Sequence, residues 1–150
     1  MKKELSISAI EHGTVIDHIP SDATFKVVEI LKLDRMKDVV SIAMNLPSKK
    51  SGIKGIIKIG GRILSKEEVD KIAIVAPHAT VNIIKDYDVK EKLDVALPES
   101  IKNIIKCSNP NCVTNVEKVK SLFYILEKKP LKVKCHYCER FMNKEDVEIL

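Results

Sequence analysis

Four cysteines in two close pairs constrain this chain more than any other feature. Cys107 and Cys112 form a C-x4-C knuckle, Cys135 and Cys138 form a C-x2-C knuckle, and the sequence contains no other cysteine. Two such knuckles can supply the four thiolates of a tetrahedral zinc site. Because sulfur would fill all four positions, none is left for water or substrate. We therefore expect one structural Zn²⁺ per chain, which stabilises a fold and performs no chemistry.

Two disulfides or a redox-active C-x2-C pair are the alternative interpretations of these cysteines. The opening residues Met1-Lys2-Lys3-Glu4 do not lead into the apolar core of a signal peptide, so we expect a cytoplasmic protein with reduced thiols. A thioredoxin-like pair would lie at a strand-to-helix junction, whereas strand-like residues 131–133 and 141–142 flank this one. The sequence therefore favours metal over disulfides or redox chemistry.

The length of the chain, 150 residues, fits one domain or two small ones. The apolar periodicity fades near residues 92–98, so we predict domains at residues 1–97 and 98–150. The second domain is too small to bury much apolar surface, which is a physical reason for it to be stabilised by a bound metal ion. No apolar run approaches the roughly 20 residues that cross a bilayer, so no membrane role is expected.

The net charge of +5 is spread along the chain. Residues 1–97 hold 16 basic and 14 acidic side chains, and residues 98–150 hold 10 and 7. One Zn²⁺ with four thiolates would remove two further charges from the second part. With only 4% aromatic residues to stack on bases, nucleic acid is a disfavoured partner, and a zinc-ribbon nucleic-acid-binding module is the alternative function.

The pattern of the first domain alternates short strands with two helices. The expected strands are residues 5–10, 14–19, 37–46, 54–59 and 79–85, with Val89 continuing the last. The first helix should run from a Ser21 or Asp22 cap to Leu33, with Phe25, Val28 and Leu31 buried. The second helix should begin at a capping box of Ser65 and Glu68 and end before Pro77. The expected fold class is α+β: an N-terminal ferredoxin-like α/β sandwich followed by a small β-rich zinc-ribbon-like domain.

Several polar residues of the first domain could surround a polyanion. Asp17 and His18 end a strand, Lys54 and Lys58 share one face of another, and Lys90 and Lys92 follow the last. Spacing alone also fits a solvated lysine face. No serine or cysteine nucleophile is evident beside Asp17-His18, and adjacent strand residues point to opposite faces, so we predict no enzymatic activity.

Several segments in order carry a family resemblance over nearly the whole chain. They are the run 13–20 (GTVIDHIP), 45–48 (NLPS), 57–59 (IKI), 76–82 (APHATVN) and the cysteine quartet. In these segments the sequence resembles the regulatory chain of aspartate carbamoyltransferase. The resemblance implies a noncatalytic subunit that self-associates as a dimer, binds CTP and ATP, with UTP as a further candidate, and docks its zinc domain on catalytic trimers. It also implies control of de novo pyrimidine biosynthesis.

The resemblance assigns two further sets of site residues. It implies nucleotide binding by Ile10, Asp17, His18, Lys58, Asn82, Ile84, Tyr87, Val89 and Lys92. It implies catalytic-chain contacts at Asn109, Asn111, Tyr137 and Glu139, which lie between or beside the cysteines. No catalytic residue is implied.

Overall fold

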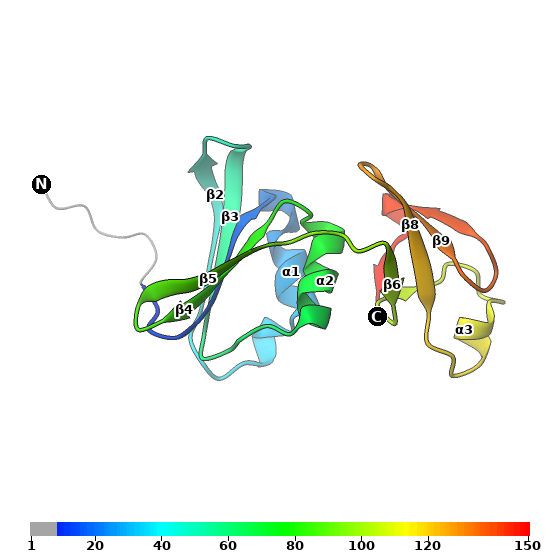
Figure 1. Cartoon of the computed structure of the whole chain (residues 1–150), viewed down its shortest axis with the longest axis horizontal. Helices are drawn as coiled ribbons and strands as arrows, with labels where there is room; N and C mark the ends of the chain where they lie inside the picture. The colour runs from blue at the N-terminus through cyan, green and yellow to red at the C-terminus, as the bar shows by residue number, and fades with distance from the viewer. Residues whose placement is uncertain (1–8) are drawn as a thin grey trace, which may run out of the picture. The chain divides into compact units, whose positions relative to one another are not determined.

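The structure is a computed structural model that describes residues 9–150, and it divides into two compact units, Met1–Ala96 and Leu97–Leu150. Each unit has its own sheet and its own buried core (Figure 1). Within the described part of the chain, no helix is both long and apolar enough to cross a membrane.

The first unit is built on a five-stranded antiparallel sheet with the order β2-β3-β1-β4-β5. Its strands are β1 (Gly13–Ile19), β2 (Val40–Ser48), β3 (Gly52–Gly60), β4 (Thr80–Lys85) and β5 (Asp88–Asp94). Helix α1 (Thr24–Ile30) connects β1 to β2, and α2 (Lys66–Val75) connects β3 to β4. This is the ferredoxin-like arrangement that the sequence predicts, with β5 added beside β4.

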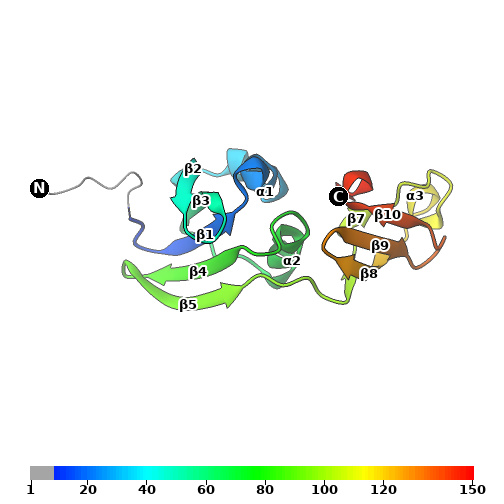
Figure 2. The same cartoon turned by 90° about the horizontal axis from the view of Figure 1, so that it is seen from above.

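Both helices cover the same face of this sheet (Figures 1 and 2). On that face Ile16 of β1 pairs with Ile57 of β3 and Val81 of β4, and all three side chains are fully buried. Val27 of α1 and Ile72 of α2 are also fully buried. The core therefore lies between the helices and one side of the sheet, and the other side is left for polar residues.

The first helix differs from the prediction in its start, its end and its buried stripe. A 3-10 turn (Ser21–Ala23) precedes α1, and Ser21 does not cap it because its Oγ accepts the Asn45 N–H at 2.7 Å. A left-handed Lys32 (φ 54°) ends the helical segment, and a second 3-10 turn, Leu33–Arg35, follows it. The buried stripe consists of Thr24, Val27 and Leu31, while Phe25 is 63% exposed and Val28 is half-buried.

The start of α2 is as predicted. The Glu68 N–H donates to Ser65 Oγ at 3.2 Å, and the Ser65 N–H donates to Glu68 Oε1 at 3.1 Å, so the capping box is confirmed. Arg62 pairs with the same Glu68 carboxylate. The helix start is therefore fixed by local hydrogen bonds that can be recognised in the sequence.

The first predicted strand lies mostly outside the described residues, and the last one ends earlier than predicted. Of the strand expected at 5–10, residues 5–8 lie outside the described part of the chain, and residues 9 and 10 are not in a strand. Val89 does not continue β4, because Asp86 and Tyr87 (φ 52° and 68°) make a tight turn that starts β5. Strand β5 is therefore a fifth strand at the edge of the sheet, beside β4.

The second unit is rich in short strands. They are β6 (Ser100–Lys102), β7 (Ile105–Lys106), β8 (Leu122–Lys128), β9 (Leu131–Cys135), β10 (Phe141–Asn143) and β11 (Glu148–Ile149). A four-stranded sheet has the order β10-β9-β8-β6, and β11 pairs with β7. A single helical turn, α3 (Val113–Val116), and a 3-10 turn, Lys144–Asp146, complete the unit. Its core contains Ile101, Ile105, Phe123, Val133 and Met142.

Candidate functional site

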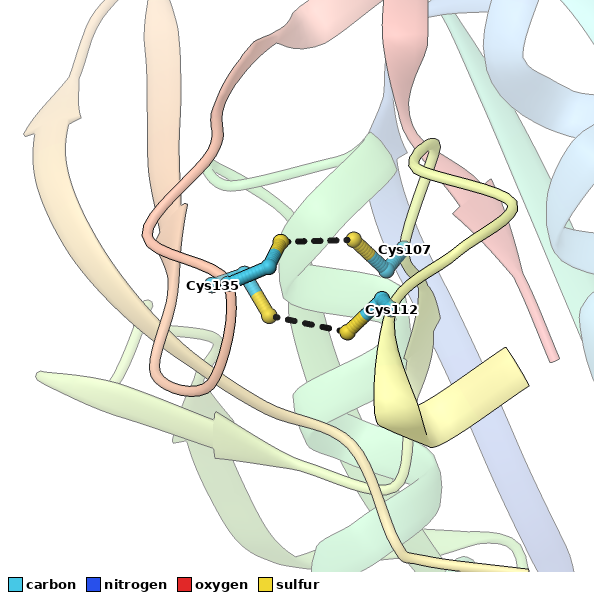
Figure 3. Close-up of side chains that lie close together, drawn as sticks. Cys107, Cys112 and Cys135 are labelled. Carbon is cyan, nitrogen blue, oxygen red and sulfur yellow. Dashed lines mark hydrogen bonds between the residues drawn. The ribbon is translucent and has the colours of Figure 1, made fainter. Parts of the chain in front are cut away.

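The four cysteines converge in the second unit as the spacing predicts. Cys107 Sγ lies 3.6 Å from Cys138 Sγ, and Cys112 Sγ lies 3.7 Å from Cys135 Sγ. All four sulfur atoms lie within 4.8 Å of one another. In Figure 3 the sulfur atoms of the three labelled cysteines point into the space between two loops. A zinc–sulfur bond of about 2.3 Å gives tetrahedral sulfur–sulfur edges of about 3.8 Å, so the cluster has the size of a single-metal site.

Neither a disulfide nor an isolated redox pair fits this arrangement. Disulfide sulfurs lie about 2.05 Å apart, well below the separations here, and all four cysteines are free. The short contacts join one knuckle to the other, Cys107 to Cys138 and Cys112 to Cys135. The geometry therefore describes one four-ligand cluster.

Short structural elements present the ligands. Cys107 follows β7, Cys112 precedes α3, and Cys135 is the last residue of β9. The first knuckle is held by Asn115, whose side-chain amide donates to the carbonyls of Cys107 (2.8 Å) and Asn109 (2.7 Å). Asn115 is not recognisable from the sequence, because an amide that binds two carbonyls of a folded loop has no signature in spacing.

Burial disfavours thiolates in this cluster, and hydrogen bonds outweigh it at Cys138. Burial raises the pKa of Cys107 to about 12 and also raises the pKa of Cys135. Burial acts in the same direction on Cys138, but hydrogen bonds from the Arg140 backbone and the Asn109 side chain lower its pKa to about 7. A divalent cation would offset the remaining cost of holding four thiolates together in a buried site.

The expected catalytic-chain contacts lie around this cluster. The side chain of Asn109 accepts the Asn111 N–H at 3.0 Å, so both asparagines belong to the first knuckle loop. Tyr137 and Glu139 flank Cys138, and Glu139 adopts a left-handed φ of 61° that closes the second knuckle. Any surface that these four residues form therefore depends on the shape of the metal loops.

In the first unit, the sheet face away from the helices brings the main nucleotide candidates into one row. Lys58 pairs with Val15 across β3 and β1, Val15 pairs with Asn82 across β1 and β4, and Asn82 pairs with Lys92 across β4 and β5. Directly paired residues project to the same side of an antiparallel sheet. Two lysines that are 34 positions apart in the sequence, and an amide from between them, thus share one face.

Asp17 and His18 occupy a bulge at the end of this face. The β1/β3 register shifts between Ile16 and Ile19, and His18 adopts a left-handed φ of 58°. A regular strand would separate the two side chains, but here His18 Nδ1 lies 4.0 Å from Asp17 Oδ2 and 3.3 Å from Thr80 Oγ1. Both contacts involve the same ring nitrogen, so the imidazole cannot relay a proton between carboxylate and hydroxyl.

Lys54 joins this group through an ion pair. Its Nζ lies 2.9 Å from Asp17 Oδ1 and 3.2 Å from Oδ2. Lys54 is one of the residues that the sequence predicts around a polyanion, although the family resemblance does not include it among the nucleotide-binding residues. The period-two spacing from Lys58 was the available signal.

The remaining nucleotide candidates lie around the β4–β5 hairpin and the entry to β1. Ile84 pairs with Gly13 of β1 and with Val89 of β5. Tyr87 lies in the hairpin turn with its side chain exposed, and its N–H donates to the Glu11 carbonyl at 3.0 Å. Ile10 is half-buried just before β1. These residues give the polar row an apolar border.

Comparison with known proteins agrees with both units. Residues 5–96 match the family model for the allosteric domain of the aspartate carbamoyltransferase regulatory chain, and residues 99–148 match the model for its metal binding domain. The regulatory chain of Pyrococcus abyssi is 57% identical over 146 residues, covering 96% of each chain. That of Bacteroides fragilis is 47% identical over 149 residues, covering 99% of this chain and 97% of its own.

Proposed function

The chain belongs to the aspartate carbamoyltransferase regulatory chain family, and from this premise we propose that it binds CTP and ATP in its first unit and controls catalytic trimers through a zinc-stabilised second unit. It is a noncatalytic subunit. UTP is a further candidate effector. The process controlled would be de novo pyrimidine biosynthesis, and the location would be the cytoplasm, where the thiols stay reduced.

Zinc, one ion per chain, is the metal that we propose for the cysteine cluster. Four thiolates favour a soft ion, and separations of 3.6 and 3.7 Å between sulfurs match a single tetrahedral ion. An iron–sulfur cluster would hold the sulfurs farther apart, because several ions and sulfides would lie between them. Cys107, Cys112, Cys135 and Cys138 would be the ligands, and the ion would supply structure and no chemistry.

The observation that carries the nucleotide proposal is the in-register row of Lys58, Asn82 and Lys92. Lysines provide the positive charge that phosphates require, and an amide can pair with a base. Asp17, beside the row, can accept ribose hydroxyls with the oxygen lone pairs that Lys54 leaves open. Lys92, on the exposed strand β5, and His18 would meet the phosphates, and Lys58 the base and ribose.

The border of the site would hold the base. Backbone groups near Ile10 and Tyr87 can donate and accept hydrogen bonds at the edge of a base, while Ile84 and Val89 supply apolar contact. No glycine-rich phosphate loop is needed in this arrangement, since the charge comes from lysine side chains on a sheet.

Control would operate by linkage between effector binding and quaternary state. A nucleotide that binds one state of the complex better than the other shifts the equilibrium by its difference in affinity, typically about 1 to 3 kcal/mol. The nucleotide itself stays unchanged. The zinc unit would dock on the catalytic chain through Asn109, Asn111, Tyr137 and Glu139, and the first units would pair as a regulatory dimer.

Isothermal titration of CTP and ATP tests the nucleotide site. Lys58→Ala and Lys92→Ala should each weaken binding about 10- to 100-fold, the range for a lost charged hydrogen bond, with zinc content unchanged. Lys26→Ala, which removes an exposed lysine from α1 on the helical side, should bind as the parent chain does. Unaltered affinity in both site variants would remove the assigned site.

A further inference from the structure

The outer face of the four-stranded sheet in the second unit carries an unusual set of exposed side chains. Phe141 of β10 pairs with Lys134 of β9, and Lys134 pairs with Tyr124 of β8, so the three lie in one row on one face. Phe141 is 57% exposed and Tyr124 is 38% exposed. The opposite face holds the buried core residues Phe123 and Val133.

Two lysines are held over the exposed aromatic ring. Lys134 Nζ lies 5.8 Å from the centroid of Phe141, and Lys132 Nζ lies 5.2 Å from the same centroid. Cation–π attraction of this kind restrains flexible ammonium groups. Less side-chain entropy is then lost when the pair meets an anionic group.

Among residues 9–150, no carboxylate forms an ion pair with a lysine of this face. Lys54–Asp17, Arg62–Glu68 and Lys66–Asp70 are ion pairs between basic side chains and carboxylates, and all three lie in the first unit. Glu127 is opposite Lys132 in the sheet register but forms no ion pair with it. Lys102 of β6, paired with Leu122, adds a third cation to the face. A matching surface should therefore be acidic.

Aromatic contacts join this face to the second cysteine knuckle. The Tyr124 hydroxyl lies 2.6 Å from His136 Nδ1, and the rings of His136 and Tyr137 meet edge to face with centroids 4.9 Å apart. Tyr137 is one of the proposed contacts with the catalytic chain. The row on the sheet is thus continuous with the docking loops.

We propose that this lysine–aromatic face, defined by Tyr124, Lys132, Lys134 and Phe141, is part of the docking surface and receives an acidic segment of the catalytic chain. The inference rests on the proposed function and extends its interface from the knuckle loops onto the sheet. Carboxylates fit better than nucleic acid, because lysines already cover the Phe141 ring on which a base would stack. Phe141 would supply apolar contact and the lysines the charge.

Binding of the zinc-loaded full chain to catalytic trimers, measured at several salt concentrations, tests the proposal. Phe141→Ala should weaken association about 30-fold, as for an interface hot spot. The pair Lys132→Glu and Lys134→Glu should weaken it at least about tenfold, with a larger loss at low salt. Val116→Ala and the pair Lys118→Glu and Lys120→Glu remove matching apolar and charged groups outside the face and should bind normally.

Each contrary result has a separate meaning. Parent-like binding by the face variants would overturn the inference and leave the proposed function intact. A parent chain that carries zinc but does not bind trimers would overturn both. Equal losses in the control variants would show an unspecific effect of charge and overturn the inference. If the face variants lost binding to a single-stranded oligonucleotide but kept binding to trimers, the face would be a nucleic-acid surface and the inference would be wrong.

Discussion

Acidification should release the metal from the four-cysteine cluster. Metal-bound cysteines are thiolates, so every thiol that carries a proton in the metal-free chain must lose it on binding. Burial raises the pKa of Cys107 to about 12 and raises that of Cys135, so both are protonated at pH 7 without metal. The metal holds the same groups deprotonated, far below those pKa values. The stability that it adds is therefore present at high pH and lost as the pH falls.

The number of protons sets the size of this effect. At least two protons leave near pH 7, so the apparent association constant should rise at least about 100-fold per pH unit. If the metal-free second unit unfolds, its thiols return to an ordinary pKa of about 8.5, and up to four protons leave. The slope would then approach about 10,000-fold per pH unit. In both cases the logarithm of the apparent association constant should rise by about two to four per pH unit.

Competition with a chromophoric chelator between about pH 6.5 and 7.5 measures this slope, after correction for the protonation of the chelator itself. Amide hydrogen exchange on the same samples should show loss of protection in the second unit as metal leaves, and none in the first, which contains no cysteine. A slope of tenfold or less per pH unit would refute the four-thiolate reasoning. Full protection of the second unit without metal would show that the metal is not needed for its fold.

Three further predictions concern assembly and stability. Cys112→Ser should abolish association with catalytic trimers, since three thiolates cannot keep the two knuckles in register; normal stoichiometry in sedimentation would contradict this. Ser65→Ala should lower the free energy of unfolding of the first unit by about 1 kcal/mol, because it removes the hydroxyl that accepts the Glu68 N–H; an unchanged denaturation midpoint would argue against a stabilising capping box. Ile72→Ala, at a fully buried site, should cost about 2 to 5 kcal/mol, whereas Phe25→Ala should cost less than about 1, and equal costs would show that the core is wrongly placed.

Much of the fold was predictable from local patterns. The capping box at Ser65 and Glu68 is a short-range signal, and the structure forms both of its hydrogen bonds. The alternation of strands and helices was enough for the ferredoxin-like class. Phe25 shows the limit of such signals. Thr24, Val27 and Leu31 have a helical spacing just as Phe25, Val28 and Leu31 do, so the spacing alone does not decide which stripe packs on the sheet.

The candidate sites, like the fold, were predictable only in part from local patterns. The two cysteine knuckles and their suitability for a metal were recognisable from the amino-acid sequence, because ligand type and spacing within a few residues decide what a metal loop can bind. Only the tertiary structure paired Cys107 with Cys138, placed Lys58, Asn82 and Lys92 in one row, and brought His18 beside Thr80 through a bulge. These relations depend on strand register between distant segments. Register is set by the packing of whole faces and by single-residue bulges, which local patterns do not encode.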